Sequence, residues 1–143
     1  YEHEKQLKMS KQEVKEERKQ MDGDPMVKSR IRSLQREMAR RRMMEQVPKA
    51  TVVVTNPTHI AIAIRYEPSE NDTPVVVAKG KRLIAARIKQ TAIDNKIPIV
   101  EDKPLARAMY DKVVEGSPIP VEFFTAIAEI LAYVLKLKNR SAA

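Results

Sequence analysis

The apolar residues of the chain are concentrated after residue 50, where their spacing alternates between strand-like and helix-like. Short runs rich in β-branched residues predict four buried strands, at residues 51–55, 60–66, 74–79 and 97–100. Apolar residues that recur every three or four positions predict three helices, at residues 80–95, 104–115 and 121–138. The expected fold is therefore a small α/β domain, in which a four-stranded mixed sheet packs with about three helices.

The connections between these elements give an expected topology. Residues 56–59 have the composition of a turn, so the two strands that they join should form an antiparallel hairpin. The strand–helix–strand order that follows favours a parallel pair with a right-handed crossover. We expect Gly80 to open the helix at residues 80–95 and Gly116 to end the helix at residues 104–115. The apolar faces of the first and last helices are expected to include Leu83, Ile84, Ile88 and Ile93, and Phe123, Phe124, Ile127, Ile130, Leu131, Val134 and Leu135.

The first part of the chain has a different pattern. Residues 1–21 are almost entirely polar helix formers, with too little apolar surface to pack against a core. After the Gly23-Asp24-Pro25 interruption, Asp24 is a suitable N-cap for a second helix that runs to about Gln46. Its apolar residues form one narrow stripe. We therefore divide the chain into a helical linker at 1–47, a domain at 48–140 and a tail at 141–143.

Charge makes this linker a candidate surface for anionic partners. The chain has a formal net charge of +8, and residues 28–44 hold seven basic residues and one acidic residue. Residues 28–42 are therefore predicted to contact anionic lipid, although a solvated helix face has the same composition. Arg-rich helices also occur in nucleic-acid-binding modules, but no aromatic residues are interleaved here and no recognition motif is present.

Composition excludes several kinds of chemistry. The chain has no cysteine and only two histidines, His3 and His59, which are far apart in sequence. Disulfides, thiol catalysis and a metal centre are therefore not expected, and no cofactor is predicted. No run of 18 apolar residues is present. Because the chain starts without methionine, we interpret it as a fragment of a longer protein.

The Asn56-Pro57 bond carries the most specific chemistry in the sequence. Deamidation of asparagine needs the next backbone nitrogen as nucleophile, and Pro57 blocks that route because its nitrogen has no hydrogen. The side-chain nitrogen of Asn56 can instead attack its own backbone carbonyl carbon, which forms a succinimide and expels Pro57 as a new N-terminus. This reaction is intramolecular, so the reacting groups are already at high effective concentration.

The neighbouring residues support cleavage at this bond. His59 is close enough in sequence to supply the proton that the departing Pro57 nitrogen needs, and backbone donors near Thr58 can polarise the Asn56 carbonyl. Such a reaction occurs once per molecule, so the chain is not predicted to be a turnover enzyme. The alternative is an inert turn, because Asn-Pro is a common turn dipeptide.

At this point the sequence resembles a known family. The run Val54-Thr55-Asn56-Pro57-Thr58-His59 resembles the hallmark of the type III export-switch family, which includes flagellar FlhB and its injectisome relatives. Four further segments resemble the same family in the same order, and the Arg-Arg-Met-Met stretch favours the flagellar branch over the injectisome branch. They are residues 41–50, residues 77–80, residues 104–110 and the final helix with Ile119-Pro120.

The resemblance implies a function and a set of partners. It implies self-cleavage between Asn56 and Pro57 with Thr58 and His59 as part of the motif, two fragments that stay associated, and a switch from rod and hook export to filament export. It also implies a membrane part outside this chain and a position on the cytoplasmic face of the bacterial inner membrane. The implied partners are export gate membrane proteins, a hook-length control protein, and exported rod, hook and filament subunits with their chaperones.

Export also requires a place where subunits dock. Pro74, Val75, Ala128 and Leu131 are candidates for an exposed apolar docking site, and the alternative is that they belong to the core. A conventional hydrolase is the remaining alternative for the whole chain, but the pattern assembles no catalytic set for it.

Overall fold

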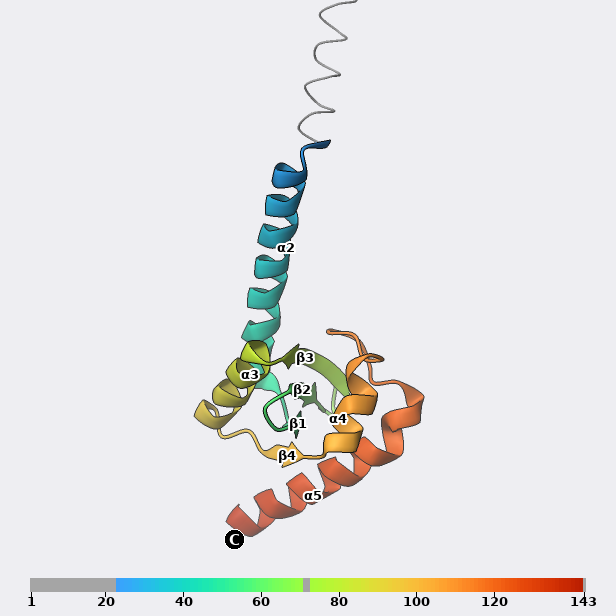
Figure 1. The fold of residues 1–143 in the computed structure, drawn as a ribbon. Helices are drawn as coiled ribbons and strands as arrows, with labels where there is room; N and C mark the ends of the chain where they lie inside the picture. The colour runs from blue at the N-terminus through green and yellow to red at the C-terminus, as the bar shows by residue number, and fades with distance from the viewer. Residues whose placement is uncertain (1–22, 71–72, 143) are drawn as a thin grey trace, which may run out of the picture. The chain divides into compact units, whose positions relative to one another are not determined.

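The computed structural model describes residues 23–70 and 73–142 and bears out the α/β class. These residues group into two units, one up to Arg41 and one from Arg42 onward. The first unit contains most of helix α2, a helix without buried residues along its length. The elements of the chain (Figure 1) are α2 Pro25–Gln46, η1 Val47–Lys49, β1 Val52–Asn56, β2 Ile60–Arg65, β3 Val75–Lys81, α3 Leu83–Asp94, β4 Ile99–Glu101, α4 Lys103–Tyr110, η2 Val121–Phe123 and α5 Phe124–Ala142.

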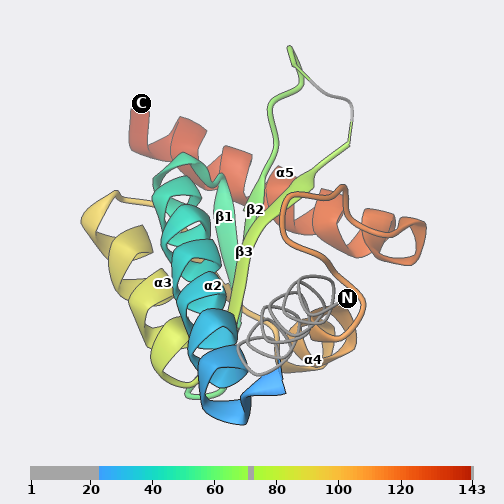
Figure 2. The same ribbon diagram turned by 90° about the horizontal axis from the view of Figure 1, so that it is seen from above.

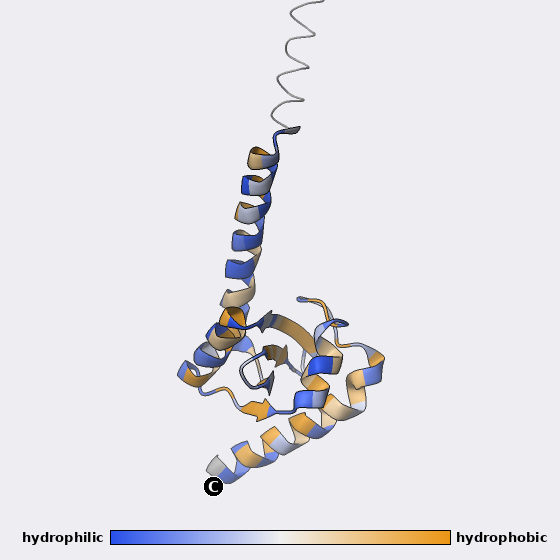
Figure 3. Cartoon of the chain, in the orientation of Figure 1, coloured by the Kyte–Doolittle hydropathy of each residue, from blue (hydrophilic) through white to orange (hydrophobic). Residues whose placement is uncertain are grey.

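The sheet is mixed, as the sequence predicts, but the predicted parallel pair of the third and fourth strands is wrong, because β4 crosses the sheet and pairs with β1 instead of β3. Its strand order is β3-β2-β1-β4, so β1 and β2 are the two central strands. β1 pairs with β2 in the antiparallel sense and with β4 in the parallel sense, and β2 pairs with β3 in the antiparallel sense. All five residues of β1 are buried. Burial on both faces explains the apolar runs of β1 and β2. In Figure 3 much of the sheet is orange, and β4 at its edge is the most clearly so.

Two apolar clusters occupy the two faces of the sheet (Figure 2). Val54 and Ile62 point into a cluster closed by α4 and α5, whereas Val53 and Ala63 point into one closed by α3. Met43, Met44 and Val47 pack in the second cluster. Successive residues of one strand therefore serve opposite layers, as the alternation of a pleated strand requires.

Lys79 joins α4 to the edge of the sheet. Its Nζ donates hydrogen bonds to the carbonyl oxygens of Tyr110 and Val113, each at 2.8 Å. These carbonyls lie at and just beyond the C-terminus of α4, where a cation also complements the helix dipole. Burial, followed by the charges of Glu115 and Asp111, raises the pKa of the Tyr110 hydroxyl above its usual value.

Several predicted boundaries are wrong. Gly80 lies inside β3 and pairs with Ala61, so it does not open a helix, and α3 begins at Leu83. The helix predicted at residues 104–115 ends at Tyr110. The residues after it turn back toward β3, where the Gly116 N–H donates to the carbonyl oxygen of Val76 at 2.7 Å. α5 extends to Ala142, into the segment predicted as a tail.

Four helix residues predicted to face the core are largely exposed. Leu83 is 81% and Ile93 60% exposed on α3, whose buried residues are Ala85, Ile88 and Ala92. The later start of α3 changes which residues face the sheet, and small alanines allow the helix to approach it closely. Phe124 and Leu135 of α5 are also exposed, at 40% and 49%.

Candidate functional site

The Asn56-Pro57 bond lies at the end of a central strand. Asn56 is the last residue of β1 and pairs with Ile60, the first residue of β2. The three residues between them lie outside the ladder. Asn56 was predicted as a turn residue, but it belongs to the strand and is only 4% exposed. The Asn56-Pro57 bond therefore connects a buried, fixed residue to a turn whose next two residues are exposed.

The carbonyl group of Asn56 has a hydrogen-bond donor in place. The backbone N–H of His59 donates to the Asn56 carbonyl oxygen at 3.0 Å. This carbonyl carbon is the atom that the Asn56 side chain would attack, and a donor on its oxygen stabilises the negative charge that develops there. The sequence predicted a backbone donor near Thr58, and the structure assigns that role to the next residue.

The turn has an unusual backbone conformation at Thr58. Its φ is 72°, in the left-handed region that a β-branched residue rarely adopts. Such a conformation costs about 1 to 3 kcal/mol and persists where the surrounding structure imposes it. The bond next to Asn56 therefore sits in a turn that is held away from its preferred conformation.

The imidazole of His59 folds back over the same turn. Its Nδ1 lies 2.7 Å from the hydroxyl oxygen of Thr58 and 3.3 Å from the carbonyl oxygen of Pro57. A protonated Nδ1 donates to these oxygens, whereas a bare Nδ1 accepts a hydrogen bond from the hydroxyl. Thr58 and His59 are both exposed. The motif thus brings a titratable ring and a hydroxyl together beside the residue that would leave.

Neighbouring elements fix both ends of the turn. The N–H of Arg82 donates to the carbonyl oxygen of His59 at 3.0 Å, and the N–H of Asp102 donates to that of Thr55 at 2.9 Å. The first contact comes from the β3–α3 junction and the second from the residue before α4. The four consecutive motif residues, from Asn56 to His59, are therefore held at both ends by segments that are distant in sequence.

Three of the four predicted docking residues line one groove. Pro74, Ala128 and Leu131 lie in a groove with a volume of about 370 Å³ between the end of the β2–β3 loop and α5. Leu131 is also a member of the core and is 5% exposed, so the alternative prediction of a core residue is confirmed for it. The remaining lining residues, which the docking prediction did not include, are Tyr66, Thr73, Phe124, Ala132 and Leu135.

Val75 is not among the lining residues. It begins β3, pairs with Arg65 and forms a bridge with Pro118. Its neighbour Pro74 lies in the groove, because side chains on consecutive positions of an extended segment point in opposite directions. The sequence did contain a signal for Phe124 and Leu135: α5 has more apolar positions than one buried face can hold, and these two are among the exposed ones, with Tyr133 and Leu137.

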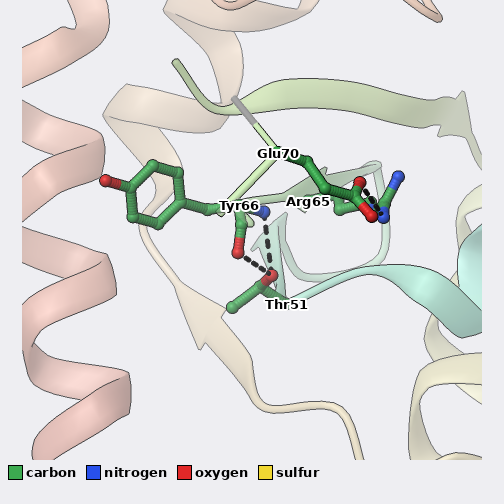
Figure 4. A network of polar contacts seen from close by, with 4 residues as sticks. All are labelled: Thr51, Arg65, Tyr66 and Glu70. Atoms are coloured by element: carbon green, nitrogen blue, oxygen red, sulfur yellow. Dashed lines mark hydrogen bonds and ion pairs between the residues drawn. The ribbon is translucent and has the colours of Figure 1, made fainter. Parts of the chain in front are cut away.

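Tyr66 reaches the groove from the end of β2. The hydroxyl of Thr51 accepts a hydrogen bond from the Tyr66 N–H at 2.9 Å and donates to its carbonyl oxygen at 3.3 Å (Figure 4). An ion pair of 2.7 Å between Arg65, the last residue of β2, and Glu70 holds the loop that follows the strand. These contacts hold the backbone from which the Tyr66 ring extends toward α5, as the close view shows.

Neither a metal cluster nor a membrane-spanning helix is found within residues 23–70 and 73–142. These residues contain no group of three His, Cys, Asp or Glu side chains that could hold a metal ion. In the same part of the chain, no helix has the length and apolar content needed to cross a bilayer.

Comparison with known proteins places this architecture in a defined class. The structure is similar to the cytoplasmic domain of FlhB from Shewanella putrefaciens, with a TM-score of 0.68 and 41% identity over 72% of this chain and 79% of that chain. It is also similar to a mutated EscU C-terminal domain, with a TM-score of 0.62 and 36% identity over 64% of this chain and 92% of that chain. The fold is thus that of the C-terminal domains of FlhB and EscU.

The sequence comparisons give the family. Residues 1–134 match the model of the FlhB HrpN YscU SpaS family, and the chain belongs to that family. It is 51% identical to the flagellar biosynthetic protein FlhB of Bacillus subtilis over 98% of this chain, and 49% identical to that of Escherichia coli over 97%. The chain spans 39% and 36% of the lengths of these relatives.

Proposed function

We propose that this domain cleaves its own backbone between Asn56 and Pro57, and that the cut controls which proteins a flagellar export apparatus accepts. The observation that carries the proposal is the hydrogen bond from the His59 N–H to the Asn56 carbonyl oxygen, 3.0 Å long. It places a fixed donor on the one carbonyl whose carbon must be attacked. The left-handed Thr58 and the ring of His59 complete the arrangement.

The proposed reaction proceeds without a second molecule in its first step. The Asn56 side-chain nitrogen attacks the Asn56 carbonyl carbon and loses a proton, and negative charge develops on the oxygen that His59 N–H contacts. The bond to Pro57 then breaks, the Pro57 nitrogen takes up a proton, and Asn56 remains as a C-terminal succinimide. Water later opens the succinimide. We assign the transfer of this proton to the ring of His59, whose Nδ1 lies 3.3 Å from the carbonyl oxygen of the same Pro57 residue.

The energy required is modest. A tenfold increase in rate needs about 1.4 kcal/mol off the barrier, so moving from days to minutes needs roughly 4 kcal/mol. One well-placed donor on a developing oxyanion contributes about 3 to 4 kcal/mol. Release of the strain at Thr58 adds to this when the strain is lost in the transition state.

The two fragments should remain together after the cut. β1 would belong to one fragment, and the strands on both sides of it, β2 and β4, to the other. Val52, Val53 and Val54 of β1 are fully buried between the two layers. Removing three buried valines costs on the order of 6 kcal/mol in apolar burial alone, before the ladder hydrogen bonds are counted. Cleavage therefore changes the turn and leaves the fold in place.

Relatives with solved structures point to the same residues. Those structures include EscU C-terminal domains in which an asparagine, the proline that follows it, or a histidine two positions after that proline is mutated. This order and spacing is that of Asn56, Pro57 and His59 in the present chain. The parallel supports a shared chemistry at this turn.

Intact-mass spectrometry under denaturing conditions tests the proposal. Wild-type protein should yield fragments that end at Asn56 and begin at Pro57, and should still elute as one species in gel filtration. Asn56→Ala, which has no nucleophile, should stay a single chain, while Asn95→Ala serves as the matched asparagine control and should cut normally. Wild type that stays uncut, or Asn56→Ala that cuts equally fast, would refute it.

The cellular setting follows from the flagellar relatives. We infer that the domain acts at the cytoplasmic face of the bacterial inner membrane, next to the export gate, where the cut allows the change from rod and hook subunits to filament subunits. In cells that carry the uncut Asn56→Ala protein, hook export should continue and filament export should fall. Normal filament assembly in these cells would contradict this role while leaving the cleavage chemistry intact.

The groove beside α5 is the proposed docking site for exported subunits. Its lining combines a buried floor at Leu131 with exposed apolar walls at Phe124 and Leu135, which suits an apolar segment of a subunit. Ala128→Asp and Leu135→Asp should weaken binding of a purified hook subunit at least tenfold with the fold retained. Tyr133→Asp, on an exposed position of α5 that does not line the groove, is the control. Equal binding by all three would exclude the groove.

A further inference from the structure

Cleavage would change the chemistry of the three residues that follow the cut. In the intact chain the Pro57 nitrogen is an amide nitrogen, whose lone pair is delocalised into the Asn56 carbonyl and cannot bind a metal. After cleavage it is a secondary amine at the start of a chain, two residues before a histidine. The new chain begins Pro57-Thr58-His59.

We infer that cleavage creates a square-planar binding site for Cu(II) or Ni(II) at this new N-terminus. The inference rests on the proposed autocleavage. The four ligands are the Pro57 nitrogen, the backbone nitrogens of Thr58 and His59, and the Nδ1 atom of His59. Nitrogen ligands in a plane are the arrangement that Cu(II) and Ni(II) favour over other divalent metals. The ligands come from consecutive residues, so they form three fused chelate rings.

The proton balance of binding is defined. At neutral pH the metal displaces one proton from the Pro57 ammonium group and one from each of the two amides, and the imidazole binds in its neutral form. The two amide anions balance the double charge of the metal, so the occupied site is neutral. Binding therefore requires no acidic side chain, and the absence of a carboxylate cluster at the turn is no obstacle.

The structure leaves these atoms accessible. Residues 57–59 lie outside the β1–β2 ladder, and Thr58 and His59 are exposed. The His59 carbonyl oxygen is held by the Arg82 N–H, but it is not a ligand, so this anchor remains when the metal binds. Metal binding breaks the hydrogen bond from the His59 N–H to the Asn56 carbonyl oxygen, and this bond is not needed once the chain has been cut.

The same geometry explains why the uncut chain lacks the site. The turn at Thr58, with φ at 72°, carries the chain back toward β1, whereas a planar chelate needs these three residues to curl around one metal ion. A free end permits that rearrangement. The His59 ring lies on the same turn, with its Nδ1 3.3 Å from the Pro57 carbonyl oxygen, and on binding it turns from that oxygen toward the backbone nitrogens.

Cu(II) titration of the cut and uncut proteins tests the inference. All samples carry His3→Ala, because Tyr1-Glu2-His3 has the same order of residues and would form the same chelate at a free terminus. Intact mass is recorded first, and a wild-type sample that has stayed one chain defeats the autocleavage proposal before any metal is added. CuSO₄ is then added at neutral pH with excess glycine, which removes weakly held metal, and visible absorption is recorded.

Cut protein should bind one equivalent of Cu(II), with the visible band of a four-nitrogen square-planar complex, and uncut Asn56→Ala should show none. His59→Ala, once its mass shows it to be cut, should lose the band. If His59→Ala cuts too slowly, wild type that is cut and then acetylated at the Pro57 nitrogen takes its place, since acetylation removes that lone pair. The inference would be overturned if fully cut wild type showed no more Cu(II) binding than Asn56→Ala. It would also be overturned if the visible band remained after His59→Ala or after acetylation of the Pro57 nitrogen.

Discussion

The backbone N–H of Arg82 donates to the carbonyl oxygen of His59 at 3.0 Å, which joins the start of α3 to the end of the Asn-Pro turn. Arg82 itself has a φ of 52°, so the contact links two segments that both contain a residue in a left-handed conformation, Thr58 being the other. Each such residue costs about 1 to 3 kcal/mol, and each is held by the surrounding fold. The conformation of the cleavage turn is therefore imposed partly from the β3–α3 junction.

This strain predicts that two substitutions at position 82 differ in the stability of the folded protein. Arg82→Gly accepts a positive φ without a Cβ clash, whereas Arg82→Ala keeps the clash and removes the same side chain. Arg82→Gly should be about 1 kcal/mol more stable to denaturant unfolding than Arg82→Ala. Glycine also frees the unfolded chain, so at an unstrained position Arg82→Gly would be less stable than Arg82→Ala, and that result would show that the junction is not strained.

Pro57→Ala should change the chemistry at Asn56 as well as its rate. Alanine restores a backbone N–H at position 57, and that nitrogen can attack the Asn56 side chain, which is the ordinary deamidation route. We expect fewer cut molecules and a new uncut species that contains isoaspartate at position 56, both measured by peptide mapping. Pro68→Ala, in the exposed loop beyond the far end of β2, is the matched control. A variant that cuts normally and forms no isoaspartate would contradict the role of proline.

Gly80 should not tolerate a side chain. A Cβ at this position would lie 2.3 Å from Cγ2 and 2.7 Å from Cβ of Ile84, because α3 starts directly against β3. Gly80→Ala should therefore lower the free energy of unfolding by about 1 to 3 kcal/mol through overpacking. Gly23→Ala, where an added Cβ meets nothing within 4 Å, is the control and should change stability little. Equal denaturation midpoints for the two variants would refute the close approach.

Lys79 and Lys81 should differ in their contribution to stability although both lie near the Tyr110 ring, at 4.7 Å and 4.5 Å from its centroid. Lys79 also donates two hydrogen bonds to carbonyls at the end of α4. Lys79→Met leaves those carbonyls without this donor and should cost on the order of 2 kcal/mol. Lys81→Met removes one exposed cation–π contact and should cost about 0.5 kcal/mol in the same urea titration.

Local patterns were enough for the class of fold and for locating the Asn-Pro turn. The β-branched runs predict the strands, because a strand that is covered on both faces carries apolar residues on both, as Val52, Val53 and Val54 of β1 do. Asn56, Pro57 and His59 are adjacent in sequence, so their chemistry can be read without a fold. The helix at Pro25–Gln46 follows from its cap and its composition.

The features that the sequence did not predict depend on contacts between segments that are distant along the chain. Gly80 belongs to a strand because Ala61 pairs with it, and Leu83 and Ile93 are exposed because alanines bring α3 onto the sheet. The groove needs Tyr66 and Pro74 to meet α5, and the turn needs Arg82 to hold His59. The residue types and the spacing of apolar residues suffice to predict helices, strands and reactive groups, since these depend on neighbours along the chain. Positions in the core, the groove and the anchored turn depend on neighbours in space, which appear only after the sheet has formed.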